Sequence, residues 1–159
     1  MAGKVKAVPD GYHTVTPYLI VRNASEAIAF YQRALGAKEL YRMDMSGGKV
    51  AHAELQIGDS RLMISDEMPA SPESIAQSPK ALGGTTMGLN VYLEDVDARV
   101  ADAVKAGATI RRPLQNQFYG DRSATIEDPF GHVWTLSTHV EDVSPEEMER
   151  RMAQMGQGH

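Results

Sequence analysis

Two residues of complementary chemistry stand two positions apart in a run of alternating apolar and polar side chains. His52 and Glu54 lie between Val50 and Ile57, and alternate residues of a β-strand point to the same face. An imidazole and a carboxylate on one face can form an acid–base pair or supply two ligands to a metal ion. No third donor can be identified from the sequence. Three interpretations of His52 therefore stay open: a hydrogen-bonded or partly solvated pocket residue, which we favour, a ligand contact, and a metal ligand.

The amino-acid composition excludes several classes of site and partner. The chain has 159 residues, 42% hydrophobic and 23% charged, which is typical of one globular domain or of two halves sharing a core. It contains no cysteine, which excludes disulfides, thiolate nucleophiles and cysteine-based metal sites. The net charge of −5 argues against a nucleic-acid partner. No apolar run approaches the ~20 residues that span a bilayer, so we expect a soluble, cytoplasmic protein that binds no membrane.

The elements that must position His52 and Glu54 belong to an internal repeat. Each copy reads as an apolar strand, a polar helix N-cap (Asn23, Asp95), an amphipathic helix and a closing glycine (Gly36, Gly107). The number of residues that separates equivalent positions of the two copies is one smaller at the closing glycine than at the strand. A one-residue slip is therefore expected within the second helix or its entry.

Strand-like segments separated by turn residues follow each helix, so each half is predicted to be β-α-β-β-β. The predicted strands are 38–45, 50–57 and 62–66 in the first half and 109–112, 122–126 and 133–138 in the second. Module 1 covers about 14–67 and module 2 about 87–139. Between them, residues 68–86 are rich in proline, serine and glycine and are predicted to be a linker with one short helical turn.

A last helix is expected within residues 144–155. Ser144, Pro145 and Glu147 have the spacing of an N-cap, a first helical residue and a capping-box partner. Three methionines, at 148, 152 and 155, would share one side of this helix. We favour a helix that caps its own core; the alternative is an apolar face that contacts a second subunit.

This order of motifs resembles a known superfamily. Two β-α-β-β-β modules, Phe30-Tyr31 late in the first helix and the run 128–132 (Asp-Pro-Phe-Gly-His) before the last strand are similar to the vicinal oxygen chelate superfamily. This superfamily includes glyoxalase I, extradiol dioxygenases and bleomycin-resistance proteins. Segments 52–59, 62–67 and 119–122 look most like its PhnB-like group. The resemblance implies an α+β fold in which a curved mixed sheet forms a cup with helices outside, and a homodimer that completes the cup.

Strand alternation then assigns residues to the inside of the implied cup. On the first strand of each module Thr16, Tyr18, Asn90 and Tyr92 would face inward, and Leu19 and Val21 would pack under the helix. On the long middle strand the inward set would be Val50, His52, Glu54 and Gln56, and the helix-facing set Ala51, Ala53, Leu55 and Ile57. Thr135 would face inward, and its neighbour Trp134 is predicted to lie in the core.

The metal site that the resemblance implies lacks its ligands. Metal-dependent members place imidazole or carboxylate donors at four positions, which correspond here to Thr16, Gly88, Thr135 and one residue within 63–65 (Met-Ile-Ser). Hydroxyl, thioether and aliphatic groups are poor substitutes for those donors. We therefore expect no metal and no cofactor, and the chemistry of glyoxalase I or of a dioxygenase is disfavoured.

Other candidates also have two interpretations. Tyr18 and Tyr92 could clasp a planar ligand or fill the cup with each other. Arg122, close to Tyr119, could hold a carboxylate or phosphate or form a surface salt bridge with Asp121 or Glu127. His132 is expected to be exposed in its turn, and His139 to approach the rim of the cup.

The favoured hypothesis is a metal-free protein that binds a planar or amphipathic small molecule, as the bleomycin-resistance group does. Its predicted ligand-binding residues are Thr16, Tyr18, His52, Glu54, Asn90, Tyr92, Tyr119, Arg122 and Thr135. One alternative is an enzyme of the isomerase, lyase or transferase type, with His52 and Glu54 as acid–base residues or as an unusual metal site. Another is an interaction module that works through the methionine face of the last helix.

Overall fold

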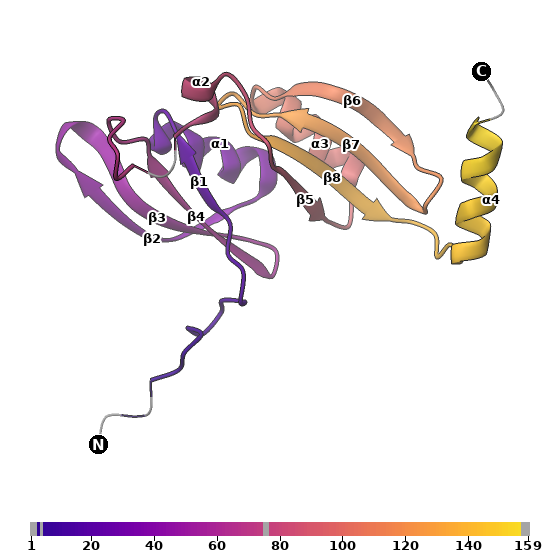
Figure 1. The fold of residues 1–159 in the computed structure, drawn as a ribbon, viewed down its shortest axis with the longest axis horizontal. Coiled ribbons are helices and arrows are strands. Elements are labelled where there is room, and N and C mark those ends of the chain that lie inside the picture. The colour runs from indigo at the N-terminus through magenta and orange to yellow at the C-terminus, as the bar shows by residue number, and fades with distance from the viewer. Residues whose placement is uncertain (1–2, 4, 75–76, 157–159) are drawn as a thin grey trace.

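The chain folds into two similar modules that lie side by side (Figure 1). The computed structural model describes residues 3, 5–74 and 77–156. Module 1 contains β1 (Tyr18–Val21), α1 (Ala24–Leu35), β2 (Lys38–Met45), a short 3-10 turn (Ser46–Gly48), β3 (Lys49–Ile57) and β4 (Ser60–Asp66). After α2 (Pro79–Leu82), module 2 contains β5 (Gly88–Tyr92), α3 (Val96–Ala106), β6 (Thr109–Asn116), β7 (Asp121–Glu127) and β8 (Val133–His139). The chain continues into α4 (Pro145–Gly156).

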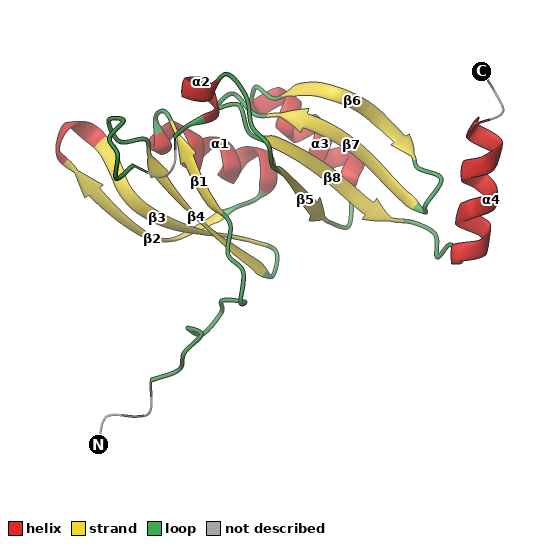
Figure 2. Ribbon diagram, viewed as in Figure 1, coloured by secondary structure: helices red, strands yellow, loops and turns green. Residues whose placement is uncertain are grey.

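Each module forms its own four-stranded mixed sheet, so the predicted α+β fold is confirmed. The strand orders are β1-β4-β3-β2 and β5-β8-β7-β6, and in each sheet the first strand pairs parallel to the last. α1 and α3 pack against each other and against the sheets, which joins the modules through their helices (Figure 2). No helix in the described part of the chain covers the other face of either sheet. We call it the open face of module 1 or module 2.

Side-chain caps set the ends of the two repeated helices. The side chain of Asn23 accepts a hydrogen bond from the amide of Glu26, and that of Asp95 accepts one from Ala98. Gly36 and Gly107 end the helices at positive φ, where a residue with a Cβ atom would be strained. α1 has 12 residues and α3 has 11. The one-residue slip between the copies therefore lies within the second helix, as predicted.

One buried carboxylate joins the modules. Asp128, 3% exposed, accepts hydrogen bonds from the Tyr31 hydroxyl on α1 at 2.6 Å and from the Trp134 indole on β8 at 2.9 Å. Its other oxygen accepts the backbone amides of Phe130 and His132 at 2.9 and 3.0 Å. Burial and the Asp128 charge raise the pKa of Tyr31 well above its ordinary value, so this phenol remains a proton donor. The motif at 128–132 therefore acts as a structural clamp between the two halves.

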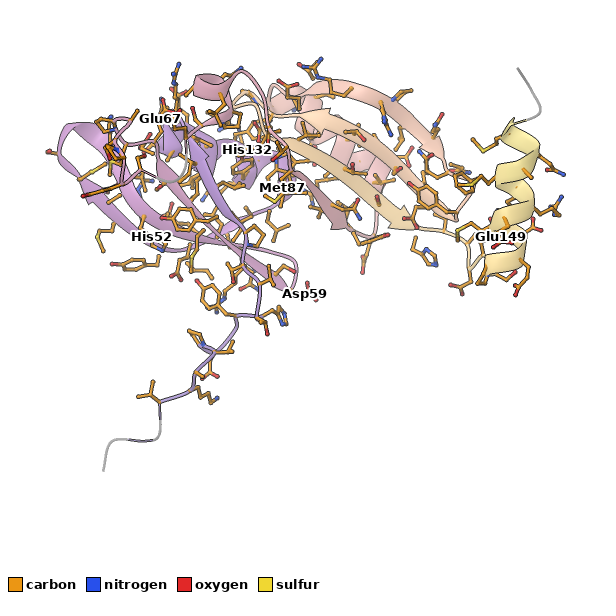
Figure 3. The ribbon with its side chains drawn as sticks, in the orientation of Figure 1. His52, Asp59, Glu67, Met87, His132 and Glu149 are labelled. Carbon is orange, nitrogen blue, oxygen red and sulfur yellow. The ribbon has the colours of Figure 1, made fainter. Side chains whose placement is uncertain are left out.

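The junction also corrects one prediction and confirms another. His132 is 8% exposed, and its Nε2 lies 3.0 Å from the carbonyl oxygen of Ile20 on β1. The expectation of an exposed turn histidine was therefore wrong, because the turn is folded back between the modules (Figure 3). Trp134, 1% exposed, lies in the core as predicted.

Two further corrections concern β3 and α4. The pairing of β2 with β3 skips Ala51, and this bulge reverses the alternation at the start of β3. Val50 is therefore fully buried, not inward-facing in the cup, and its amide donates to Asp66 at 2.7 Å. α4 has no buried residue and stands apart at the far end of module 2 (Figure 1), so it does not cap its own core. None of the helices in the part of the chain that the structure describes has the length and apolar character to cross a membrane.

The clamp predicts a specific loss of stability. Asp128→Asn keeps the shape of the side chain but replaces one acceptor oxygen with an NH2 group. This NH2 group would face N–H or O–H donors that now bond to the carboxylate. We expect a loss of about 2–4 kcal/mol in the free energy of unfolding, measured by urea denaturation. Asp59→Asn, at the exposed β3–β4 turn, is the matched control and should change stability by less than about 0.5 kcal/mol. Equal denaturation midpoints for the two variants would contradict the clamp.

Candidate functional site

One row of side chains crosses all four strands on the open face of module 1. Strand register places Tyr41 opposite Glu54, Glu54 opposite Met63, and Met63 opposite Tyr18, and directly paired residues share a face. We call these four residues the module 1 row. Its two tyrosines are 47% and 44% exposed. A carboxylate and a thioether are thus placed between two aromatic rings that are open to a ligand.

His52 organises the centre of this face. The Tyr18 hydroxyl lies 2.8 Å from Nδ1 of His52, and Nε2 of His52 lies 3.5 Å from a Glu54 oxygen. When the imidazole is neutral and carries its proton on Nε2, the Tyr18 hydroxyl donates to Nδ1, and Nε2 faces the Glu54 carboxylate. The side chains of His52 and Glu54 are 25% and 24% exposed. The predicted placement of His52 and Glu54 on one open face is thus confirmed, together with Tyr18.

The segment before β1 closes one end of the face. The Arg61 guanidinium stacks 4.8 Å from the centre of the Tyr12 ring and donates to the carbonyl of Asp10 at 3.2 Å. Gly11, at φ +82°, lies so close to this guanidinium that a Cβ atom would overlap it. Burial, followed by the neighbouring Glu54 carboxylate, raises the pKa of Tyr12. The Tyr12 side chain therefore lies beside both Arg61 and Glu54.

Two buried polar atoms at this end lack partners. In residues 3, 5–74 and 77–156, the Tyr12 hydroxyl and Nε of Arg61 are the buried side-chain polar atoms with no hydrogen bond. Such atoms are rare in folded proteins and often mark a place where water, an ion or a ligand belongs. Both belong to the same contact, beside Glu54.

A groove of about 770 Å³ runs between the modules. Its lining includes Thr16 and Arg61 from module 1 and Asn90, Tyr92 and Arg99 from module 2. The predicted ligand residues are thus divided: Thr16, Asn90 and Tyr92 line the groove, whereas Tyr18, His52 and Glu54 lie on the open face. Arg61 belongs to both regions, so the groove and the face meet at this side chain.

The open face of module 2 holds a different polar cluster. Tyr92 donates to Asp121 at 2.8 Å, and this hydrogen bond is the largest cause of a raised pKa for Tyr92. Nδ1 of His139 lies 2.8 Å from the buried Asp121, and Nε2 lies 2.9 Å from the exposed Asp142. Hydrogen bonds to Asp142 and then to Asp121 raise the pKa of His139. The histidine expected near a rim is thus held between two carboxylates at the end of β8.

Of the remaining predicted residues, Thr135 lies on the open face of module 2, opposite Asn90, whereas Arg122 and Tyr119 lie elsewhere. Arg122 pairs with Asp97 on α3 through two hydrogen bonds of 2.8 Å, so it lies on the helix side of its sheet and does not reach the open face. This pair is a salt bridge, as one interpretation proposed, but with a different partner. Tyr119 packs edge-to-face on Phe118 before β7. Thr135 lies 3.2 Å, hydroxyl to hydroxyl, from Thr125.

The donor set does not fit the metal that the superfamily implies. The corresponding positions carry Thr16, Gly88, Thr135 and a residue within 63–65. Within the described ranges, no three histidine or acidic side chains come together in a way that could hold an ion. A transition metal needs about three nitrogen, sulfur or carboxylate ligands. These residues therefore support no chemical step through a metal.

Sequence reasoning missed Tyr12, Arg61, Tyr41 and Met63. The alternation of β4 places Arg61 and Met63 on one face, but only the strand register brings them opposite Gln56 and Glu54. Tyr12 precedes the first strand and had no periodic signal. Its place depends on a turn in which its amide bonds to the carbonyl of Pro9 at 3.1 Å.

Comparison with known proteins agrees with this architecture. The sequence model of the Glyoxalase/Bleomycin resistance protein/Dioxygenase superfamily matches residues 12–136, and the chain belongs to this superfamily. An uncharacterized protein of Mycobacterium tuberculosis is 38% identical over 144 residues, which cover 91% of this chain and 85% of that protein.

Solved structures share the same fold. TioX from Micromonospora sp. ML1 superposes with a TM-score of 0.62 at 25% identity and covers 83% of this chain and 100% of its own. The PhnB protein of Bacillus cereus superposes with a TM-score of 0.60 at 18% identity and covers 79% of this chain and 99% of its own. The second likeness shows the fold alone, and it places a PhnB protein among the structural neighbours.

The His139 cluster predicts a pH effect with a defined sign. The imidazolium donates to both carboxylates, so its contribution to stability is present below the ordinary histidine pKa and is lost as pH rises through the raised one. Asp142→Asn should lower the pKa of His139 toward its ordinary value, as followed by NMR titration of the ring protons. The same measurement on Glu146→Gln, at the exposed start of α4, should show no change. If the pKa of His139 stays the same in Asp142→Asn, the Asp142 carboxylate is not the cause of the shift.

Proposed function

We propose that the protein is a metal-free binding protein for a planar or amphipathic small molecule, and that the open face of module 1 provides the site. The proposal is supported by the module 1 row, which combines two exposed rings, a thioether and a carboxylate. Ligand pockets generally pair an apolar lining with a few placed polar groups. The groove between the modules extends the same surface past Arg61. A cytoplasmic location stays a prediction.

The observation that carries this proposal is the arrangement around His52. Both of its ring nitrogens face a protein group, the Tyr18 hydroxyl at 2.8 Å and the Glu54 carboxylate at 3.5 Å. A general base needs a nitrogen free to approach the substrate proton. A substrate proton approaching Nδ1 of His52 would have to displace Tyr18, and one approaching Nε2 would meet the Glu54 carboxylate first. The arrangement therefore favours an imidazole that orients its neighbours for binding, and the enzyme hypothesis has weaker support.

A binding experiment tests the role of the face. A thermal-shift screen with planar antibiotics and metabolites should identify a ligand that raises the melting temperature with concentration. Tyr18→Phe removes one hydroxyl and should lower the affinity for that ligand by about three- to tenfold, as measured by calorimetry. Tyr119→Phe, away from the face, is the matched control and should bind as the native chain does. A chelator should leave the affinity unchanged. A ligand whose affinity is lost on chelation, or is equal in both tyrosine variants, would overturn the proposed site.

We also propose that the site is completed by a second copy of the chain. The open faces of both sheets expose large apolar side chains, among them Tyr18, Met43 and Tyr92. On α4, Met152 and Met155 are 59% and 61% exposed, and the helix buries none of its own residues. Exposed apolar faces of this kind are typical of protein interfaces, and a homodimer would cover them.

The expected dimer can be tested on α4. Met152→Lys places a charge on the methionine face and should shift the chain toward monomer in analytical ultracentrifugation, because an unpaired charge is costly to bury. Gln154→Lys adds the same charge on another side of the helix and should leave the dimer intact. A native chain that sediments as a monomer would contradict the homodimer. A dimer that tolerates Met152→Lys would confine the interface to the sheets.

A further inference from the structure

Two opposite charges on the open face of module 1 stand close together but do not pair. Register places Glu54 opposite Met63 and Gln56 opposite Arg61, so Glu54 and Arg61 are diagonal neighbours on paired strands. Diagonal Cα atoms are about 7–8 Å apart, within reach for two long side chains. No salt bridge nevertheless joins these two among the residues that the structure describes. Instead Glu54 is directed to His52, and Arg61 to the Tyr12 ring and the Asp10 carbonyl.

Both charged groups keep hydrogen-bonding capacity for a ligand. A guanidinium has five N–H donors, and the hydrogen bond that Arg61 makes within the described residues uses one of them. Its Nε and the adjacent Tyr12 hydroxyl are buried without partners. A carboxylate oxygen of a ligand would supply the missing acceptor, and arginine binds carboxylates with two parallel bonds. Glu54 makes a 3.5 Å contact with His52, and its carboxylate can still bind a cationic group of a ligand.

We infer that the ligand of this site is a zwitterionic amino acid with an aromatic side chain, whose carboxylate binds Arg61 and whose ammonium group binds Glu54. This inference rests on the proposed function and names its ligand class. Charged hydrogen bonds are about 2.7–2.9 Å long. A molecule that carries both charges on one carbon atom offers each of these two diagonal neighbours a partner of opposite charge. Neither a simple acid nor a simple amine satisfies both ends.

The module 1 row accounts for the aromatic side chain of the ligand. Tyr41 and Tyr18 lie at the two ends of the row, with Met63 between Glu54 and Tyr18. Aromatic rings pack favourably on other rings and on thioether sulfur. Tyr12 completes the site as a positioning residue, because its ring holds the Arg61 guanidinium at 4.8 Å.

Three related compounds test the inference on the native full-length chain by calorimetry. L-Phenylalanine carries both charges, 3-phenylpropionate lacks the ammonium group and phenethylamine lacks the carboxylate. L-Phenylalanine should bind about tenfold or more tightly than either analogue, the effect expected from one charge-assisted hydrogen bond. Equal affinity for all three compounds, or no binding of L-phenylalanine up to about 10 mM, would overturn the inference.

Variants assign each charge to its partner. Glu54→Gln removes the partner of the ammonium group, so L-phenylalanine should no longer bind more tightly than 3-phenylpropionate. Arg61→Gln removes the partner of the carboxylate, so L-phenylalanine should no longer bind more tightly than phenethylamine. Glu26→Gln and Arg33→Gln alter exposed charges on α1, on the helix side of module 1, and should keep both preferences. Should a site variant fail to fold by circular dichroism, the comparison of compounds on the native chain still decides. A native chain that binds a neutral planar compound through Tyr18 but not L-phenylalanine would refute the zwitterion and leave the proposed function standing. Binding of neither compound would refute both.

Discussion

A buried carboxylate holds the two halves of the molecule together, alongside the packing of α1 on α3. Asp128 belongs to module 2, yet one of its oxygens holds Tyr31 from the first helix while the other orders the turn that leads into β8. A buried charge is costly unless several donors surround it, so this arrangement tolerates little displacement of one module from the other. The groove, with Arg61 at its edge, lies between the two modules that this junction holds together.

The two copies of the repeated pattern have open faces with different chemistry. In module 1, Tyr18 and Glu54 flank His52 at a site where both rings and charges remain available. In module 2, Tyr92 and His139 are directed to Asp121, which uses most of their hydrogen-bonding capacity within the protein. The same strand order therefore provides a candidate ligand site in one half and an internally satisfied cluster in the other. This asymmetry supports placing the ligand on module 1.

Much of the architecture was predictable, because it depends on local signals. Helix caps at Asn23 and Asp95, closing glycines and strand alternation act over a few residues, and they located the elements of both modules. The face shared by His52 and Glu54 followed from their spacing alone. Local signals failed where the pairing between strands is irregular. Met43 and Asp44 of β2 pair with His52 and Val50 of β3, so Ala51 is an extra residue without a partner, and this bulge turns Val50 to the opposite face.

By itself, the sequence determined the two-module fold and the absence of imidazole and carboxylate groups at the positions where the superfamily binds metal, since both depend on residue type and order. Only the tertiary structure decided which groups meet. The contact of Tyr12 with Arg61, the burial of His132 and the pairing of Arg122 with Asp97 join residues that are distant in the chain. No local preference specifies such contacts, because they result from how sheets, helices and the segment before β1 pack together.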